Sequence, residues 1–352
     1  MSNPPPSLQY PKPILDANAS RSSAHLSTHT LAQHLYSGHR VSLQDRYAKG
    51  ERILSDLRLL LAAPTKEADY QTKRAFQQRF QPLAKQLLVP VTQNTIPLPD
   101  APFIGFLSRF YPKLSTFHLS FLDVKRLHES WKRYKAGLLF AVLGHRIHPI
   151  YGVYAPTRTT HLELFATWLR QYQGSKSLGI DVGTGCGVLA HLLCRSGFQE
   201  VRATDINPNS IHSVQSDADR LSHPITAVHT DLIGSTSLCA DLIVFNPPWM
   251  AGSTQHLLDQ ALYFEQDLFP RFFDQALRNM HEHSRLVLVF SNILRLVQPK
   301  YPHPIETELA RGRFTLVQTM HRRVKGARTQ SGKRRKTREK VEIWELRKSE
   351  TL

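Results

Sequence analysis

The chain has 352 residues, 41% of them apolar, and a formal net charge of +17 from 45 Lys and Arg against 28 Asp and Glu. The length leaves room for two domains, and the apolar content suffices for hydrophobic cores. No apolar run approaches bilayer length, no hydrophobic stretch follows the N-terminus, and the three cysteines lack C-x-x-C spacing, which excludes the membrane and disulfide-rich classes. We expect a cytoplasmic monomer with a polyanionic partner, no membrane partner and no metal.

The first part of the chain predicts an accessory domain. Residues 1–40 mix Pro, Ser, Thr and His with few large apolar residues, which is typical of a mobile tail. Residues 41–150 are expected to form a mainly helical, substrate-selecting domain. The predicted helices are Asp45–Ala62, Lys66–Leu88 and Leu122–Tyr134, and a predicted β-hairpin joins Leu138–Leu143 to Arg146–Tyr151. Basic side chains of the third helix either face solvent or contact substrate phosphates.

A glycine-rich stretch begins the second part. Leu178–Ala190 is an apolar run that ends in three alternating glycines and passes into a helical pattern. Gly183, Gly185 and Gly187 let the backbone turn where a Cβ would clash, and let it approach a ligand closely. The stretch therefore predicts a strand, a tight turn and a helix, with a ligand at the turn.

Acidic residues indicate which ligand this is. Gly185–Ala190 also satisfies the dinucleotide pattern G-x-G-x-x-[GA], with Asp205 at about the expected distance downstream. However, Asp181 stands before the first glycine, where a carboxylate would repel a pyrophosphate but suits an ammonium group. S-adenosylmethionine carries that group and no phosphate, so we expect it as the cofactor. Asp205 ends the second predicted strand and can accept both ribose hydroxyls, and Asp231 ends the third.

Strands and helices alternate through the rest of the chain. The fourth strand, Ala240–Asn246, runs into two prolines and a tryptophan. The other predicted elements are helices over Thr159–Gln171 and Leu258–Met280, and strands over Arg285–Phe290, Phe314–His321 and Val341–Leu346. Alternating βαβ units imply a parallel sheet with helices on both faces.

Over about residues 151–352 the chain resembles the class I S-adenosylmethionine-dependent methyltransferases with an Asn-Pro-Pro-aromatic motif. Asp-x-Gly-x-Gly-x-Gly from Asp181, the distal Asp205 and Asn246-Pro-Pro-Trp249 occur in one order, although the family's aromatic is more often Tyr or Phe. The group includes adenine and guanine amino-methyltransferases and protein-glutamine methyltransferases. The resemblance implies an α/β, Rossmann-like fold with a doubly wound, seven-stranded, mostly parallel sheet that ends in an antiparallel hairpin.

The resemblance also assigns site residues. The expected cofactor-binding residues are Asp181, Gly183, Thr184, Gly185, Gly187, Asp205, Ile206, Asp231, Leu232 and Asn246. The expected catalytic residues are Asn246, Pro247, Pro248 and Trp249. In related enzymes the segment before the helix at 159–171 covers the site, so Tyr154 and Thr157 are candidates for contacting substrate. The alternative there is an ordinary Pro-turn with Tyr154 packed inward.

The Asn-Pro-Pro-Trp motif fits methyl transfer to a conjugated nitrogen. The lone pair of such a nitrogen must face the methyl group, so its two hydrogens need acceptors. The Asn246 side-chain oxygen can accept one and the Pro247 carbonyl the other, while consecutive prolines stiffen the turn. Trp249 offers a ring for stacking a flipped base or packing a glutamine stem. An ordinary Pro-Pro turn is the alternative, and the upstream glycine motif argues against it.

A basic loop favours nucleic acid as the partner. Residues 325–340 fall between the last two predicted strands, and their positive charges lie among Gly, Ser, Thr and Gln. The expected phosphate contacts are Lys333, Arg334, Arg335, Lys336 and Arg338. We expect methylation of a base amino group in ribosomal or transfer RNA. The alternatives are methylation of a glutamine in a ribosomal protein or release factor, and a non-catalytic nucleic-acid-binding protein.

Overall fold

The protein consists of two compact units in a computed structural model. The structure describes residues 7–15, 20–21, 25–65, 70–235, 237–253, 262–324 and 338–350. The smaller unit is Tyr10–Lys135, and the larger unit combines Met1–Gln9 with Ala136–Leu352. The chain therefore leaves the larger unit after Gln9 and returns to it at Ala136.

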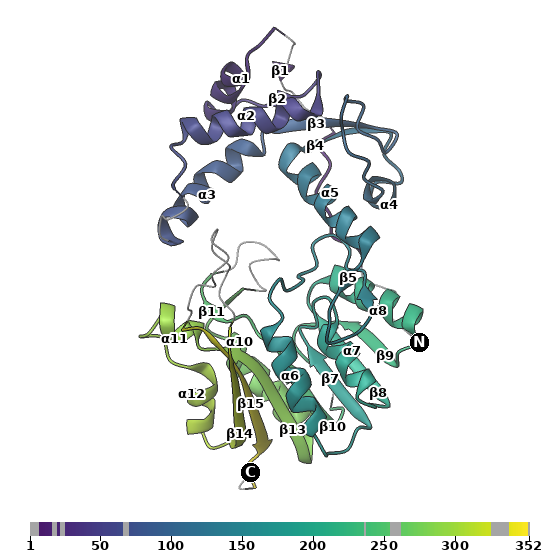
Figure 1. Cartoon of the computed structure of the whole chain (residues 1–352), viewed down its shortest axis with the longest axis vertical. Coiled ribbons are helices and arrows are strands. Elements are labelled where there is room, and N and C mark those ends of the chain that lie inside the picture. Colours follow the sequence, from purple (N-terminus) through teal and green to yellow (C-terminus); the bar gives the residue numbers. More distant parts are fainter. Residues whose placement is uncertain are drawn as a thin grey trace. The chain divides into compact units, whose positions relative to one another are not determined.

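The larger unit is built on a seven-stranded sheet with the order β14-β15-β13-β10-β7-β8-β9 (Figure 1). Its strands are β7 (Leu178–Val182), β8 (Glu200–Asp205), β9 (Ile225–His229), β10 (Ala240–Phe245), β13 (Met280–Ser291), β14 (Phe314–Arg323) and β15 (Lys340–Lys348). The five strands from β13 to β9 pair in parallel, whereas β15 is antiparallel to both β13 and β14. The predicted doubly wound sheet with its antiparallel final hairpin is confirmed.

Helices connect the strands and cover both faces of this sheet. They are α6 (Thr160–Gln171), α7 (Val188–Arg195), α8 (Pro208–Leu221), α10 (Leu268–Arg278), α11 (Ile293–Val297) and α12 (Pro304–Ala310). Figure 1 shows α6 and α7 in front of the sheet and α10 behind it. Helix α10 turns Phe269, Phe272 and Phe273 into a core that also contains Ile180 of β7 and Ile243 of β10. This packing holds β7 and β10 rigidly, so the residues that follow them have defined positions.

The helix predicted over Leu258–Met280 is too long at both ends. Residues 254–261 lie outside the described part of the chain, and Tyr263–Phe264 forms β12, which pairs in parallel with β11 (Met250–Ala251). Helix α10 starts at Leu268, and Met280 already belongs to β13. The adjacent aromatic residues Tyr263 and Phe264 favour a strand, so the predicted helix should not have included them.

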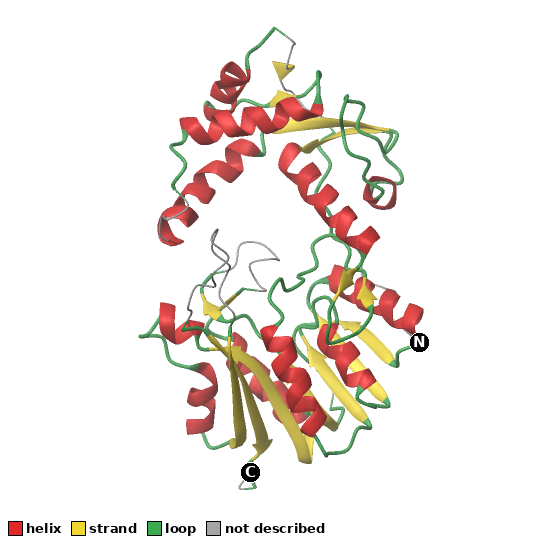
Figure 2. Ribbon diagram, in the orientation of Figure 1, coloured by secondary structure: helices red, strands yellow, loops and turns green. Residues whose placement is uncertain are grey.

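The smaller unit is mainly helical, as expected, but it also contains a four-stranded sheet that the sequence did not predict (Figure 2). Its helices are α1 (Thr28–Tyr36), α2 (Tyr47–Leu60), α3 (Tyr70–Ala84), α4 (Phe106–Phe110) and α5 (Phe121–Ala136). The sheet order is β1 (Ser20–Arg21), β2 (Val41–Ser42), β3 (Leu87–Thr92) and β4 (Thr116–Ser120). The helix predicted over 66–88 was wrong at its end, because Val89, Val91 and Thr92 favour a strand.

Two domain expectations need correction. A mobile tail over residues 1–40 is wrong for α1, whose Leu31, Ala32 and Leu35 are fully buried. Three apolar residues on one helical face were enough for packing, despite the polar composition around them. The unit boundary also falls after Lys135, so the predicted hairpin belongs to the larger unit. That hairpin is present but short, with β5 (Leu138–Leu139) antiparallel to β6 (Arg146–Ile147).

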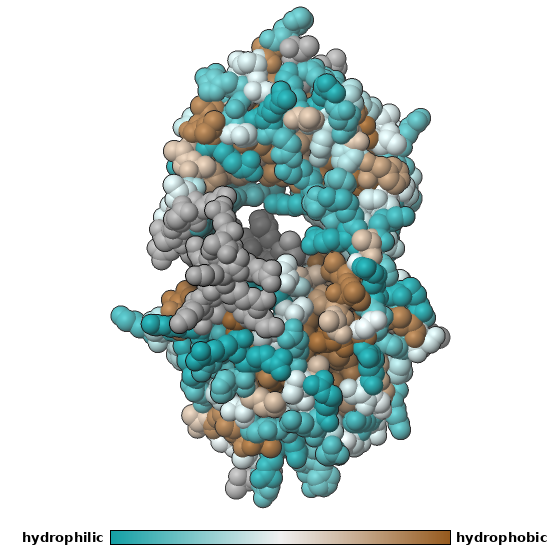
Figure 3. All heavy atoms as spheres, in the orientation of Figure 1, coloured by the Kyte–Doolittle hydropathy of each residue, from teal (hydrophilic) through white to brown (hydrophobic). Residues whose placement is uncertain are grey.

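Hydrophilic side chains cover much of the face shown in Figure 3. Within the described ranges, the helices are all too short or too polar to cross a membrane.

Candidate functional site

A cavity of about 630 Å³ opens at the carboxyl ends of the parallel strands. Its wall includes residues that follow each of four strands, namely Gly183 after β7, Asp205 at the end of β8, Asp231 after β9 and Asn246 after β10. The strand order reverses at β7, which lies between β10 and β8. Open α/β sheets bind ligands at this kind of position, because the loops on either side run apart and leave a crevice.

The glycine-rich turn after β7 has the predicted conformation. Gly183, Gly185 and Gly187 have φ values of 61°, 56° and 85°, in the left-handed region that favours glycine. A Cβ on Gly187 would lie 2.9 Å from a methyl carbon of Val214. The turn therefore favours glycine at these positions, and Thr184 and Gly185 line the cavity.

Asp181 supports this turn from below. Its side chain is 1% exposed, and Oδ2 accepts hydrogen bonds from Thr184 Oγ1 (2.6 Å) and Ala190 N (2.9 Å). Burial raises the pKa of Asp181 to about 7, although both hydrogen bonds favour the charged form. The carboxylate thus ties the turn to the first residues of α7. Its predicted contact with a cofactor ammonium group stays a prediction.

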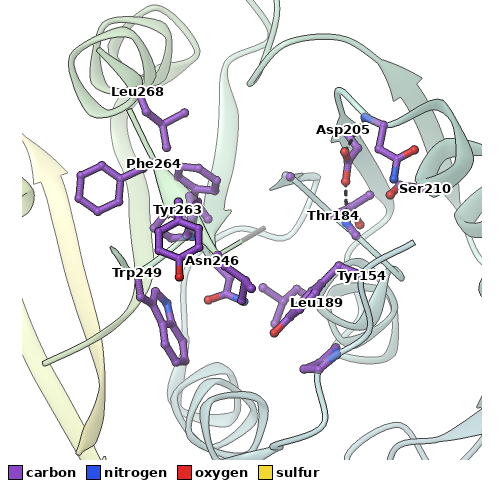
Figure 4. Close-up of a pocket in the computed structure, with 18 of the residues that line it drawn as sticks. Tyr154, Thr184, Leu189, Asp205, Ser210, Asn246, Trp249, Tyr263, Phe264 and Leu268 are labelled. Atoms are coloured by element: carbon purple, nitrogen blue, oxygen red, sulfur yellow. Dashed lines mark hydrogen bonds between the residues drawn. The ribbon is translucent and has the colours of Figure 1, made fainter. Parts of the chain in front are cut away.

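Asp205 holds the other side of the turn. Its Oδ2 accepts a hydrogen bond from Gly185 N and its Oδ1 one from Asn207 N, both at 2.8 Å. Burial raises the pKa of Asp205, against the opposing effect of these hydrogen bonds. Figure 4 shows the carboxylate beside Thr184 and Ser210 at one end of the cavity. A carboxylate oxygen has two lone pairs, so each can accept a ligand hydroxyl in addition to its backbone bond.

The next two expected cofactor residues lie along the same wall. Ile206 is exposed and Leu232 is buried, and both line the cavity. Asp231 forms an ion pair with Arg271, which also bonds to Asp267 Oδ2 at 2.8 Å. The sequence did not predict Arg271 as part of the site, because it lies on α10, 40 positions from Asp231.

Asn246 carries a buried acceptor with no partner. It follows the fully apolar end of β10, and its Oδ1 is inaccessible to solvent without a hydrogen bond to any described residue. In Figure 4 its side chain lies between Tyr263 and Trp249 on one side and Tyr154 and Leu189 on the other. Leaving a buried carbonyl unpaired costs about 1–3 kcal/mol, so this oxygen adds no hydrogen bond to the stability of the described protein, and its predicted contact with a ligand donor stays a prediction.

Trp249 forms part of the wall. Its Nε1 donates a hydrogen bond to the Val289 carbonyl at 3.2 Å. The indole also meets His161 edge to face, with ring centroids 5.6 Å apart. Burial lowers the pKa of His161 to about 4, so this cavity-lining imidazole is neutral at physiological pH.

Sequence reasoning missed His161, Tyr263 and Phe264. His161 lies in the helix that was predicted over 159–171, and no sequence motif marked it. Tyr263 and Phe264 were assigned to a helix, whereas in β12 they alternate: Phe264 is buried in the core, and Tyr263 is half-buried beside Asn246 (Figure 4).

Residues that were predicted to contact substrate lie on the rim. Tyr154 and Thr157 both line the cavity, and the Tyr154 carbonyl passes close to Gly185. Arg158 pairs with Glu339 at 2.8 Å, and Glu339 belongs to the same wall.

The basic loop starts and ends beside this cavity. Lys333, Arg334, Arg335 and Lys336 lie outside the described residues, but both ends of the loop are described. Val324 N donates to the Glu339 carbonyl at 2.9 Å, and the Arg338 carbonyl accepts a bond from Asn292 Nδ2 at 3.2 Å. Val324 and Glu339, which flank the loop, are therefore hydrogen-bonded to each other, and Glu339 lines the cavity.

Among the residues that the structure describes, no cluster of three His, Cys, Asp or Glu side chains is placed to hold a metal ion.

Comparison with known proteins relates this fold and site to methyltransferases. Residues 152–310 match the methyltransferase small domain family. A "putative protein N5-glutamine methyltransferase" of Methanocaldococcus jannaschii is 26% identical over 88 residues, covering 25% of this chain and 45% of the relative. A "ribosomal protein L11 methyltransferase" of Lacticaseibacillus paracasei is 36% identical over 93 residues, which cover 26% of this chain and 28% of the relative. The chain thus spans less than half the length of either curated relative.

Solved structures with similarity include the Thermus thermophilus 16S rRNA N2 G1207 methyltransferase, crystallised with S-adenosylmethionine and guanosine. It is 17% identical with a TM-score of 0.42, covering 88% of this chain and 72% of that chain. The ribosomal protein L11 methylase of Lactobacillus delbrueckii is 23% identical with a TM-score of 0.39, and the similarity covers 58% of this chain and 84% of that chain. The match to the methyltransferase small domain family thus covers residues 152–310, which contain β7, β8, β9, β10 and β13 of the seven-stranded sheet.

Proposed function

We propose that the protein is an S-adenosylmethionine-dependent N-methyltransferase that modifies an amino group of an RNA base. The observation that carries this proposal is the Asn246 Oδ1 atom, a buried acceptor without a partner in the wall of the cavity. An amino hydrogen of the target would satisfy it, and the site would then favour a substrate that carries a hydrogen-bond donor over one that carries none.

The residues around the glycine turn fit the cofactor. Asp205 has carboxylate oxygens at the cavity wall for the two ribose hydroxyls, and the left-handed glycines leave the backbone open to close approach. Asp181 places a titratable carboxyl beneath the turn, where a cationic ligand would favour its charged form. When bound, S-adenosylmethionine supplies a methyl group that its sulfonium has already activated.

The chain's own residues would then position the acceptor nitrogen. Asn246 Oδ1 and the Pro247 carbonyl each accept one amino hydrogen, which turns the nitrogen lone pair towards the methyl carbon. If the methyl group passes to this nitrogen, the sulfonium would leave as a thioether and the nitrogen would lose one proton to solvent. The rings of Tyr263 and Trp249 line the space beside Asn246, where a planar target would lie.

The basic loop supports RNA as the substrate. Six of the thirteen residues from Lys325 to Thr337 are Lys or Arg, and Glu339, shortly after this loop, lines the cavity. Such a segment can hold phosphates while a base enters the cavity. The name of the Thermus relative, a ribosomal RNA guanine N2-methyltransferase, agrees with this substrate class.

A second candidate is methylation of a glutamine amide in a ribosomal protein or release factor. Two observations favour it: the names of the curated relatives, and the presence of two amide hydrogens on glutamine that Asn246 and Pro247 could bind equally well. A non-catalytic RNA-binding role is disfavoured, because it would not require an unpaired Asn246 oxygen. We also propose that the protein acts as a cytoplasmic monomer. Light scattering after size exclusion would test the monomeric state.

The deciding experiment uses tritiated S-adenosylmethionine with ribosomal RNA, transfer RNA and purified ribosomal proteins in separate reactions. We expect label in RNA, and digestion to nucleosides should identify a base methylated on its amino nitrogen. Label in a ribosomal protein, released as methylglutamine, would replace the RNA proposal with the second candidate. Cofactor binding without label in any fraction would support the non-catalytic role.

A further inference from the structure

One face of α8 carries a ladder of buried polar side chains. Asn209, Ser213 and Asp217 are four residues apart and only 1%, 2% and 3% exposed. They bind the extended segment His148–Tyr151 along its backbone. Asp217 Oδ2 accepts a hydrogen bond from His148 N (2.6 Å), and Ser213 Oγ accepts one from Ile150 N (3.1 Å). Asn209 Nδ2 donates one to the Tyr151 carbonyl (2.7 Å). Side chains of α8 thus form hydrogen bonds with backbone groups of a segment that belongs to none of the described strands.

Asn209 at the top of the ladder also binds the N-terminal segment. Its Oδ1 accepts from Gln9 N at 2.8 Å, and its Nδ2 donates to the Gln9 carbonyl at 2.6 Å. The amide pairs with both polar groups of Gln9, as another peptide group would in a sheet. Gln9 is the last residue before the chain enters the smaller unit, and His148–Tyr151 follows its return at Ala136. Both connections are therefore fastened to one side chain.

The backbone of Asn209 is linked through Asn207 to the end of the cavity that Asp205 lines. Asn207, two residues earlier, accepts a bond from Asn209 N, and its own N–H donates to Asp205 Oδ1 at 2.8 Å. Asn207 Nδ2 also donates to the Gly152 carbonyl at 3.0 Å. The segment held by Asn207 and Asn209 continues to Tyr154 on the cavity wall.

We propose that Asn209 is a positioning residue for cofactor binding, and that Gln9 completes the support although it lies outside the cavity. The inference rests on the proposed function for the identity of the cofactor. Asn209 holds the Tyr151–Tyr154 segment against α8, and the bonds to Gln9 fix the orientation of its amide. Without Gln9, the buried Oδ1 of Asn209 loses its partner, and the amide can rotate away from Tyr151.

The chain offers a matched pair of variants to test this. Gln9→Pro removes the N–H that donates to Asn209 but keeps the carbonyl, whereas Gln9→Ala keeps both backbone groups. We expect the proline variant to bind S-adenosylmethionine about two- to tenfold more weakly by calorimetry, and the alanine variant to bind like wild type. Asn209→Asp, which keeps the acceptor but loses both donated bonds, should be at least as weak.

A merely structural role would lower the melting temperature without changing affinity at 20 °C, where all variants are folded. Equal affinities for Gln9→Pro and Gln9→Ala would overturn the inference. If the wild type bound no S-adenosylmethionine, the proposed function would fail first. Amide hydrogen exchange of Gly152–Tyr154 without ligand then still decides the support role: faster exchange in Gln9→Pro than in Gln9→Ala supports it, and equal exchange refutes it.

Discussion

Replacing Asn246 by alanine should separate catalysis from both folding and cofactor binding. The Asn246 Oδ1 atom makes no hydrogen bond to a described residue, so its loss breaks no bond in the ligand-free protein. The thermal stability should stay unchanged or rise slightly, because an unpaired buried acceptor is removed. Turnover should fall by roughly 10²–10³, the effect of losing one preorganised contact to the reacting group, or about 2.7–4 kcal/mol.

Asn279 provides the control. It is fully buried like the Asn246 oxygen, but its Oδ1 accepts from Leu238 N (3.0 Å) and its Nδ2 donates to the Gln275 carbonyl (2.8 Å). Asn279→Ala leaves both partners unpaired and should lower the free energy of unfolding by about 2 kcal/mol or more, with near-normal turnover in the folded fraction.

The assay is a single-turnover reaction with labelled cofactor and the substrate that the tritium-labelling experiment identifies, together with calorimetry and thermal melts. S-adenosylmethionine affinity should be nearly the same in Asn246→Ala and wild type, because the lost contact serves the acceptor nitrogen. Normal turnover in Asn246→Ala would refute the assignment. A large loss of stability in the same variant would show that the oxygen has a structural partner.

Four further predictions concern the cofactor, the folding stability and the loop. Asp205→Ala should weaken S-adenosylmethionine binding by about 1.5–3 kcal/mol, and calorimetry that shows NAD binding instead would contradict the cofactor assignment. Because burial raises the pKa of Asp181 to about 7 in the free protein, the cationic cofactor should bind up to about tenfold more tightly at pH 8 than at pH 6. Asp181→Asn should lose this dependence. The same raised pKa means that the contribution of Asp181 to folding stability declines as pH rises from about 4 to 7, which urea titrations would detect. Replacing five loop residues with Ser should weaken RNA binding and flatten its salt dependence by up to about 0.7 in log–log slope per lost contact, while cofactor affinity stays the same. These are Lys333, Arg334, Arg335, Lys336 and Arg338. An unchanged salt slope would favour the protein-glutamine alternative.

The sequence by itself determined the catalytic unit's architecture. Glycines at 183, 185 and 187 encode a left-handed turn locally, and the apolar runs of β7 and β10 encode strands buried on both faces. The alternation of these signals along the chain implied a parallel sheet with helices on both faces, whereas the seven-stranded arrangement with its final hairpin was implied by the family resemblance. Asp205 and Asn246 follow directly from strand ends, so their place at one edge of the sheet could be predicted as well.

Only the tertiary structure decided how those residues are engaged. Asp231 pairs with Arg271 from α10, the Trp249 indole bonds to Val289 of β13, and Asn209 binds a residue 200 positions away. Each partner belongs to an element distant in sequence, and no local pattern carries its position. The lack of a partner at Asn246 Oδ1 is of the same kind, since it depends on every group packed around it. Local steric and hydrophobic rules are readable along the chain, whereas the pairing of buried polar groups depends on packing in three dimensions.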